Sequence, residues 1–200
     1  MSGNIIDFNL NRRKAMSKRI ISILVVCVLA LSCVFAGTDG EQANAGKGIL
    51  LVSGSPSAYQ WIKVDQDIYK STCGVAASVG YLWNVVKGLK VGASVEWTNF
   101  TQEKLSIYGS FNNIALLARA SYGGMLSEKV FANAGLGLGY EVVLAGNNVS
   151  HAFCTELDAN MGVVVDDVFS FFAGVKGMAV IQKASQSFSV MPSLGAGITL

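Results

Sequence analysis

The segment from Val130 to Val143, VFANAGLGLGYEVV, alternates two kinds of residue along its length. Its even positions are all apolar, namely Ala132, Ala134, Leu136, Leu138, Tyr140 and Val142. The odd positions from Asn133 to Glu141 include three glycines. A period of two is that of a β-strand with two unlike faces. This part of the chain therefore has to form a strand that is apolar on one face and polar or empty on the other.

The glycine-rich face indicates which way such a strand points. In a soluble barrel that face would meet water, where glycine weakens a strand without giving it a polar surface. Glycine suits a crowded interior in which the backbone curves tightly and side chains from several strands converge. We therefore expect the apolar face to contact lipid and the Gly, Asn and Glu face to line a narrow barrel. A soluble lipocalin-like barrel, the alternative, would place the apolar face inside and charge outside.

The same alternation recurs along the chain and predicts eight strands. They cover about 48–54, 68–83, 89–98, 110–124, 130–143, 151–163, 169–182 and 188–200. A content of 52% hydrophobic and 14% charged residues, with 22 glycines and two prolines, agrees with a membrane-embedded sheet. A strand of about twelve residues tilted by about 40° spans about 30 Å, the thickness of a bilayer core. The predicted fold is all-β, an eight-stranded antiparallel up-and-down transmembrane β-barrel.

The predicted connections differ in length at the two ends. Those near 84–88, 126–129 and 165–168 are short, whereas those near 55–67, 99–108, 145–150 and 183–187 are longer. Bacterial outer-membrane barrels have short periplasmic turns and longer outer loops. Tyr59 and Trp61 lie in the longest predicted outer loop and are its candidate contact residues. Outward aromatic residues near both ends predict two interfacial girdles: Tyr81, Trp83, Tyr122 and Phe171, then Trp97, Tyr140, Phe153 and Phe188.

The amino-terminal end has the features of a secretory signal peptide. Five basic residues between Arg12 and Arg19 precede the apolar run Ile20 to Leu31, which is too short for a typical membrane-spanning helix. A small-x-small site ends at Ala36, and Met16 is a possible true start. The alternative is a lipoprotein acylated at Cys33. The predicted organisation is a cleaved signal peptide over 1–36, a short flexible leader over 37–46 and the transmembrane barrel over 47–200.

Two cysteines, Cys73 and Cys154, remain after the predicted cleavage. The strand registers place Cys73 outside and Cys154 inside, so we expect no disulfide between them. The charge balance is near neutral, which gives no electrostatic reason for nucleic-acid binding.

The architecture over residues 47–200 resembles the small eight-stranded outer-membrane barrels of the OmpA, OmpX and OmpW kind. The resemblance rests on strand number, alternation and girdles rather than on a diagnostic motif. It implies residence in the outer membrane of a Gram-negative-type envelope, contact with its lipid, and insertion by the barrel assembly machinery. Such barrels end in an aromatic residue that this machinery reads. Here the sequence ends at Leu200, and Phe188 is its last aromatic residue.

The predicted inward faces collect most of the charge found within strands. An unpaired charge in a narrow, partly dry lumen costs several kcal/mol, so a balanced set predicts ion pairs that plug the interior. Arg119 is the expected hub, because its planar guanidinium can hold two carboxylates. We expect Arg119 to pair with Glu141 and Glu96; the alternative is a set of hydrated charges without a gating role. The predicted lumen residues are Lys70, Lys90, Glu96, Arg119, Glu141, Glu156, Asp158 and Lys176.

Two classes of function fit this fold. One is a closed barrel that displays its loops for adhesion, host interaction through extracellular ligands, or envelope integrity. The other is an OmpW-like narrow passage for small or apolar molecules, which would need a side opening. Eight strands leave no room for a wide porin-type channel.

Neither catalysis nor a cofactor is expected. The single histidine, His151, lies five residues from Glu156, which is too far for a direct hydrogen bond along one strand. No nucleophile motif surrounds these residues. The sequence has neither the Cys and His clusters of zinc sites nor the acidic spacing of calcium loops, so no metal site is predicted.

Overall fold

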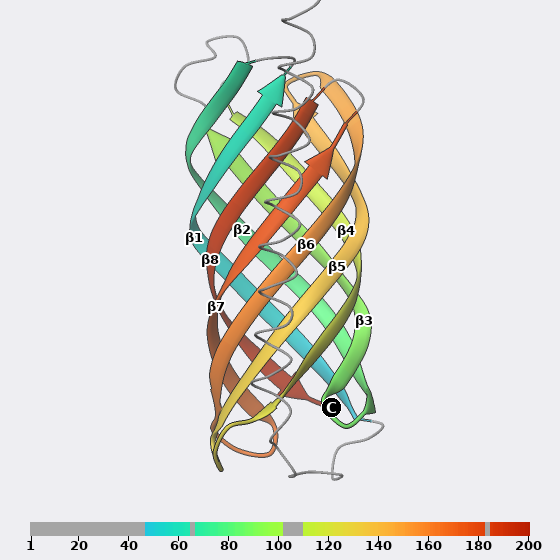
Figure 1. Ribbon diagram of the computed structural model, residues 1–200, viewed down its shortest axis with the longest axis vertical. Helices are drawn as coiled ribbons and strands as arrows, with labels where there is room; N and C mark the ends of the chain where they lie inside the picture. The colour runs from blue at the N-terminus through green and yellow to red at the C-terminus, as the bar shows by residue number, and fades with distance from the viewer. Residues whose placement is uncertain (1–46, 65–66, 102–109, 183–184) are drawn as a thin grey trace, which may run out of the picture. The chain divides into compact units, whose positions relative to one another are not determined.

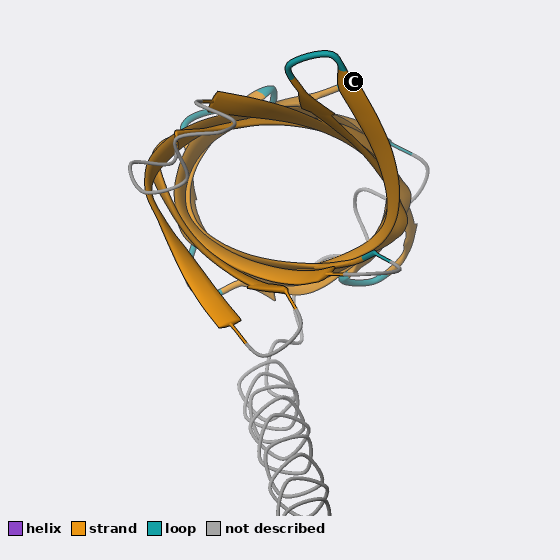
Figure 2. Cartoon of the chain, turned by 90° about the horizontal axis from the view of Figure 1, so that it is seen from above, coloured by secondary structure: helices purple, strands orange, loops and turns teal. Residues whose placement is uncertain are grey.

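The computed structural model describes residues 47–64, 67–101, 110–182 and 185–200. Eight strands form a closed barrel in which each strand pairs antiparallel with its sequence neighbours, and β8 pairs with β1 (Figures 1 and 2). This confirms the predicted eight-stranded antiparallel barrel. The strands are β1 (Gly48–Val64), β2 (Asp67–Val86), β3 (Leu89–Thr101), β4 (Ser110–Met125), β5 (Val130–Ala145), β6 (Asn148–Val164), β7 (Phe169–Ile181) and β8 (Ser185–Thr199).

The predicted signal peptide (1–36) and leader (37–46) lie outside the described residues. The described part of the chain contains no helix that is long and apolar enough to cross a membrane.

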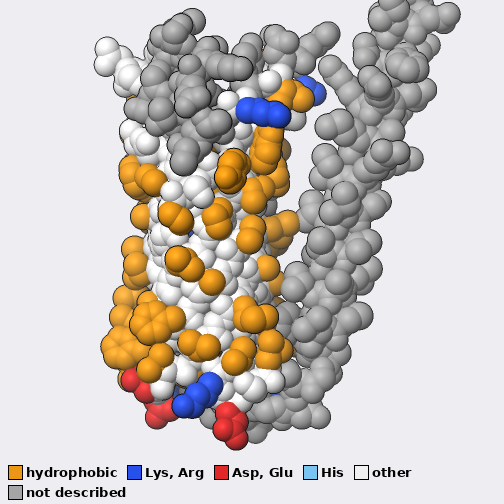
Figure 3. All heavy atoms as spheres, turned by 90° about the vertical axis from the view of Figure 1, so that its left-hand side faces the viewer, with side chains coloured by type: hydrophobic (Ala, Val, Ile, Leu, Met, Phe, Trp, Pro, Cys, Tyr) orange, Lys and Arg blue, Asp and Glu red, His pale blue; other side chains and the backbone are white. Residues whose placement is uncertain are grey.

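The barrel wall has the predicted orientation. Leu136 and Leu138 are 43% and 48% exposed on the exterior, whereas Glu141 on the opposite face is 1% exposed. Figure 3 shows apolar side chains spread over the visible wall, with the charged side chains confined to its two ends. The apolar residues that alternate along β5 therefore face outward. An exterior this apolar is more stable in contact with lipid than in contact with water.

The predicted girdle residues also lie on the exterior. Tyr81 packs edge-on against Trp83, with ring centroids 4.6 Å apart. The other members are exposed: Tyr122, Phe171, Trp97, Tyr140, Phe153 and Phe188. We name the two ends of the barrel by its connections. The turn end holds the connections β2–β3, β4–β5 and β6–β7, and the loop end holds β1–β2, β3–β4, β5–β6 and β7–β8.

The prediction of long connections at the loop end is wrong at three places. β1 continues to Val64, so only residues 65–66 separate it from β2. β5 and β6 are joined by residues 146–147, where Gly146 supplies a positive φ of 58° that this tight turn requires. Residues 182–184 join β7 to β8. Only the β3–β4 connection, residues 102–109, is longer, and it lies outside the described residues.

Tyr59 and Trp61 are therefore strand residues, and their predicted placement in an outer loop is wrong. Their role as contact residues stays a prediction. The alternation around Pro56 is broken because β1 contains irregular pairing between Ser55 and Gln60, not because the strand ends there. Trp61 pairs with Phe188 on β8, and their rings stack with centroids 6.1 Å apart.

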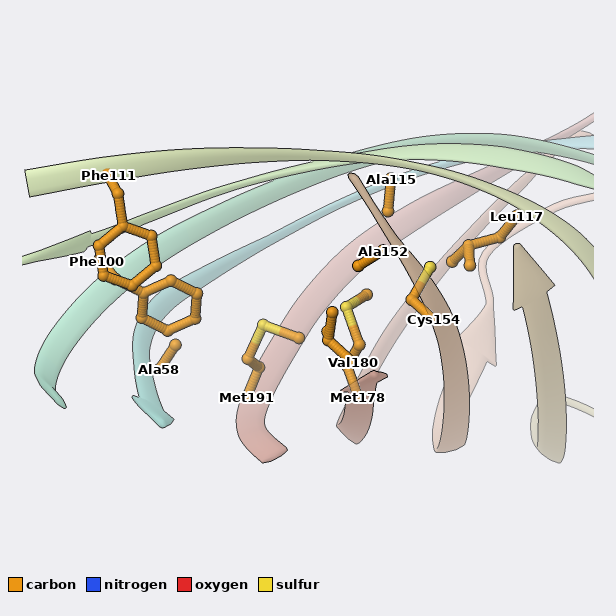
Figure 4. Close-up of a cluster of buried hydrophobic side chains, with 10 residues drawn as sticks. All are labelled: Ala58, Phe100, Phe111, Ala115, Leu117, Ala152, Cys154, Met178, Val180 and Met191. Carbon is orange, nitrogen blue, oxygen red and sulfur yellow. The ribbon is translucent and has the colours of Figure 1, made fainter. Parts of the chain in front are cut away.

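Two layers of side chains fill the lumen. Toward the loop end, apolar residues from six strands form a cluster, which we call the apolar tier (Figure 4): Ala58, Phe100, Phe111, Ala115, Leu117, Ala152, Cys154, Met178, Val180 and Met191. Cys154 is buried there as a free thiol, and the side chain of Cys73 lies outside the description. The second layer consists of charged, amide and hydroxyl groups, and we call it the polar tier: Ser53, Ser78, Glu96, Arg119, Asn133, Glu156, Asp158, Asn160 and Lys176.

Candidate lumen site

Arg119 contacts two carboxylates of the polar tier. It stands on β4 in one cross-strand row with Gly137 on β5 and Glu156 on β6. Because Gly137 has no side chain, the guanidinium passes over β5 and reaches the next strand. Its Nη2 lies 2.9 Å from Glu156 Oε1 and also donates to Asp158 Oδ2. One arginine therefore holds two carboxylates, although they are not the two expected.

The expected pairing of Arg119 with Glu141 and Glu96 is wrong. Glu141 lies on β5 four residues beyond Gly137, about 13 Å further toward the loop end at strand spacing. Its cross-strand neighbours are Ala115 and Ala152, both members of the apolar tier. Glu141 is thus a carboxylate among apolar side chains, with no ion pair among the described residues.

Glu96 is paired instead with Lys176, across the lumen from β7 to β3. Lys176 Nζ donates to Glu96 Oε2 at 2.8 Å and to Ser78 Oγ at 3.0 Å. Ser78 Oγ in turn lies 2.6 Å from Ser53 Oγ. The pair is buried, and its chain of hydrogen bonds ties β7 to β3, β2 and β1. The polar tier therefore bridges the lumen rather than lining it.

Lys70 does not belong to this tier, so its prediction as a lumen residue is wrong. It is exposed, and its partner across the ladder is Trp61 on the outer face. The cause is a change of register: Ala58 pairs with Gly74, whereas Gln60 pairs with Ser71. Two residues of β1 thus match three of β2, which exchanges the inner and outer faces of β2 beyond this point.

Lys90 is half-buried near the turn end, and no ion pair is found for it within the described ranges. Without Lys70, the predicted lumen set holds three basic and four acidic groups. The equal number of basic and acidic lumen residues expected from the sequence is therefore not found, because one basic residue is missing. In the part of the chain that the structure describes, Glu141 is the buried carboxylate left without a partner of opposite charge.

Sequence reasoning missed the neutral members of the polar tier. Asn160 donates to Asp158 Oδ1 and, at 3.1 Å, to Asn133 Oδ1, which extends the network toward the turn end. Ser78 and Ser53 extend it to β1. A sequence signal existed for Arg119, because the glycines of β5 leave space beside it. For the serines no comparable signal was available.

The lumen also holds polar atoms outside these ion pairs and hydrogen bonds. Several buried acceptors have no hydrogen-bond partner, among them Glu96 Oε1, Glu141 Oε2 and Glu156 Oε2. Among the described residues, no group of three or more His, Cys, Asp or Glu is placed to hold a metal ion. His151 is exposed on β6, where its ring stacks on Tyr140 with centroids 5.6 Å apart.

Comparison with known proteins shows that this chain is similar in fold to solved structures. The sequence matches no protein-family model and no curated protein. Among solved structures, Neisserial surface protein A aligns with a TM-score of 0.56 and 15% identity, covering 76% of this chain and 97% of that one. Ail, the attachment invasion locus protein of Yersinia pestis, aligns with a TM-score of 0.50 and 16% identity, covering 78% and 99%. The barrel has the fold of these small outer-membrane barrels.

Proposed function

We propose that this protein is a bacterial outer-membrane barrel with a plugged lumen, which presents its loop end for adhesion, host interaction or envelope integrity. The observation that carries the proposal is the inverted distribution of side chains. Leu116 is 60% exposed on the outside, while Glu156 is fully buried inside. A water-soluble barrel would pay heavily for that arrangement, whereas a bilayer favours it.

Both tiers support the proposal of a closed lumen. In the polar tier, Lys176 reaches Glu96 across the barrel, and Arg119 spans β5 to reach Glu156. In the apolar tier, Phe100 and Phe111 stack with ring centroids 5.4 Å apart. An ion would have to break the buried pairs and then pass an apolar constriction, which is costly in each case.

The display role draws its support from likeness. Neisserial surface protein A is named for the cell surface, and the Yersinia protein for attachment and invasion. The contact surface on this chain would be formed by the loop-end connections. Tyr59 and Trp61 are better assigned to the lipid interface, because Trp61 stacks on Phe188 in the outer girdle.

Two experiments test the proposal. Refolded protein in planar bilayers should give no stable openings, and regular single-channel conductance would overturn the plugged lumen. For display, an epitope inserted between Gly146 and Asn147 should be accessible to antibody on intact cells. The same epitope between Ser127 and Glu128, at the turn end, should be accessible only after permeabilisation. Recovery of the protein in the aqueous fraction after membrane extraction would overturn the membrane assignment itself.

The OmpW-like passage is the second candidate. A lateral passage out of a narrow barrel needs two neighbouring strands whose hydrogen bonding is incomplete. Between Gly54 and Tyr59 the pairing of β1 with β8 is irregular, which favours this candidate at one place in the wall. Transport of a small apolar dye into vesicles that contain the protein, but not into vesicles without it, would support the OmpW-like passage.

A further inference from the structure

The seam where β8 closes onto β1 is interrupted at mid-height. Gly54 pairs with Leu194 and Tyr59 with Val190, but the residues between these pairs have no partners across the seam (β1 beside β8 in Figure 1). Four residues of β1 face three of β8 there. The wall therefore lacks regular cross-strand pairing over one stretch that lies well inside both strands.

Both prolines of the chain lie in this interruption. Pro56 is on β1 and Pro192 on β8, and both are exposed on the exterior. Proline has no amide hydrogen to donate, so neither position can complete the ladder. Pro56 and Ser57 also have no partner on β2, and the Ser55 hydroxyl donates to the Ser57 carbonyl at 2.6 Å. Local hydrogen bonding replaces the ladder at this place.

A small cavity with a mostly apolar lining and a few polar groups lies behind the interruption. Its volume is about 10 Å³, which is room for about one water molecule. Hydroxyl groups and one ammonium group contribute to its lining: Ser53, Ser55, Ser78, Ser193 and Lys176. Ser193 is 2% exposed, and its Oγ has no hydrogen-bond partner among the described residues. One small polar group in the adjoining water-sized space would satisfy this buried hydroxyl.

We propose that this cavity binds one small hydroxyl group and is reached from the lipid side through the interrupted seam. The group is either a water molecule or the hydroxyl of an alcohol dissolved in the bilayer. Ser193 Oγ is one contact. Lys176 is the other, because its ammonium has three hydrogens and donates two of them to Ser78 and Glu96. The inference rests on the membrane-embedded barrel proposed above, but it requires no passage through the lumen.

The lining of the cavity explains why access comes from outside. Met191, which is fully buried, and Lys176, bound to Glu96, stand between the cavity and the rest of the lumen. On the other side, Gly54 and Ala77 belong to the wall itself and have little or no side chain. The route through the wall is thus short, and the route along the lumen is filled.

Thiol labelling of Ser193→Cys in lipid vesicles tests the proposal. The matched control is Ser94→Cys, because Ser94 is also buried in the lumen with an unpartnered hydroxyl but stands where β3 pairs regularly with β2 and β4. Both variants are made with Cys73→Ser and Cys154→Ala. The reagents are uncharged methyl methanethiosulfonate, which enters the bilayer, and its charged sulfonatoethyl analogue, which stays in water.

Uncharged reagent should label Ser193→Cys about tenfold faster than Ser94→Cys, because local opening of a weakly paired seam exposes one site and not the other. The charged reagent should label neither at a comparable rate. Equal rates at the two sites would overturn the inference. Faster labelling of Ser193→Cys by the charged reagent would also overturn it, since access would then come from water. Heat-modifiable migration and co-sedimentation with vesicles show separately that each variant is inserted, so failure of the membrane assignment is recognised independently.

A competition measurement separates the two sources of the hydroxyl. Addition of a long-chain alcohol to the vesicles should slow labelling of Ser193→Cys and leave Ser94→Cys unchanged if the bilayer supplies the group. An unchanged rate at Ser193→Cys, with the uncharged reagent still selective for it, assigns the site to water.

Discussion

The apolar tier and the polar tier fill the same narrow lumen by different means. In the apolar tier, bulky side chains such as Phe100, Phe111 and Leu117 pack together. In the polar tier, Arg119 lies between Gly92 and Gly137 in its row, and these glycines leave room for its guanidinium. Lys176 lies instead between Asp158 and Met191, and its side chain extends across the lumen to Glu96. Glu141, a carboxylate between alanines of the apolar tier, is the exception to this division.

The largest expected effect comes from removing the hub of the polar tier. Arg119→Met leaves Glu156 and Asp158 buried without their cation, and breaking such a pair costs about 3–5 kcal/mol. Urea unfolding from lipid vesicles should show a loss of this size. Lys129→Met, at an exposed turn position, is the control and should change the free energy of unfolding by less than about 0.5 kcal/mol. Equal stability of the two variants would mean that the polar tier is merely hydrated.

The corresponding change in the apolar tier is Leu117→Ala. Leu117 is fully buried, and truncating a core leucine costs about 2–5 kcal/mol through lost contacts and the cavity left behind. Its neighbour Leu116 is 60% exposed to the lipid side. Leu116→Ala should therefore cost clearly less in the same unfolding assay. A larger loss for Leu116→Ala would reverse the assignment of inner and outer faces.

A smaller effect is expected from two glycines of β5 that lie in adjacent rows. A Cβ at Gly139 would collide with the backbone carbonyl of Leu116, so Gly139→Ala should cost about 1–3 kcal/mol. A Cβ at Gly137 would lie 3.3 Å from Glu156 Cβ and 3.4 Å from Leu117 Cδ1. Gly137→Ala should thus be tolerated better. If thermal unfolding ranks the two in the opposite order, the register of β4 with β5 needs revision.

The smallest expected effect has the opposite sign. Glu141→Gln removes a charge that has no cationic partner among the described residues. The Glu141 carboxylate has a hydrogen bond with Asn113, but its Oε2 is unpartnered, and a buried polar atom without a partner costs about 1–3 kcal/mol. The variant should be more stable than the parent by about 1 kcal/mol in urea. Glu156→Gln, which weakens a paired carboxylate, should instead be less stable. Destabilisation by both substitutions would show that the hydrogen bond with Asn113 outweighs the cost of burying the Glu141 charge.

The orientation of the wall could be predicted from sequence because it depends on one strand at a time. The alternation through Leu136 and Leu138 fixes their side of the sheet once the glycine face is assigned to the interior. The inward position of Arg119 follows from the same rule. These inferences need no knowledge of how neighbouring strands are aligned.

The partners of the charges could not be predicted, because pairing depends on register between strands. Arg119 meets Glu156 only because Gly137 lies between them in one row. Lys70 changes sides through a shift of register that its local sequence does not reveal. Irregular pairing around Pro56 also breaks the alternation of β1, so the second half of this strand was predicted as a loop. Bulges and cross-strand alignment are properties of the closed barrel, not of any single segment.

The fluorescence of the native tryptophans tests the central claim most directly. The chain has three, Trp61, Trp83 and Trp97, and all are exposed on the exterior. In vesicles of lipids brominated along the acyl chain, the account predicts strong quenching of their emission and little further quenching by aqueous iodide. Emission that iodide quenches and brominated lipid leaves unchanged would place these faces in water and contradict the membrane-embedded barrel.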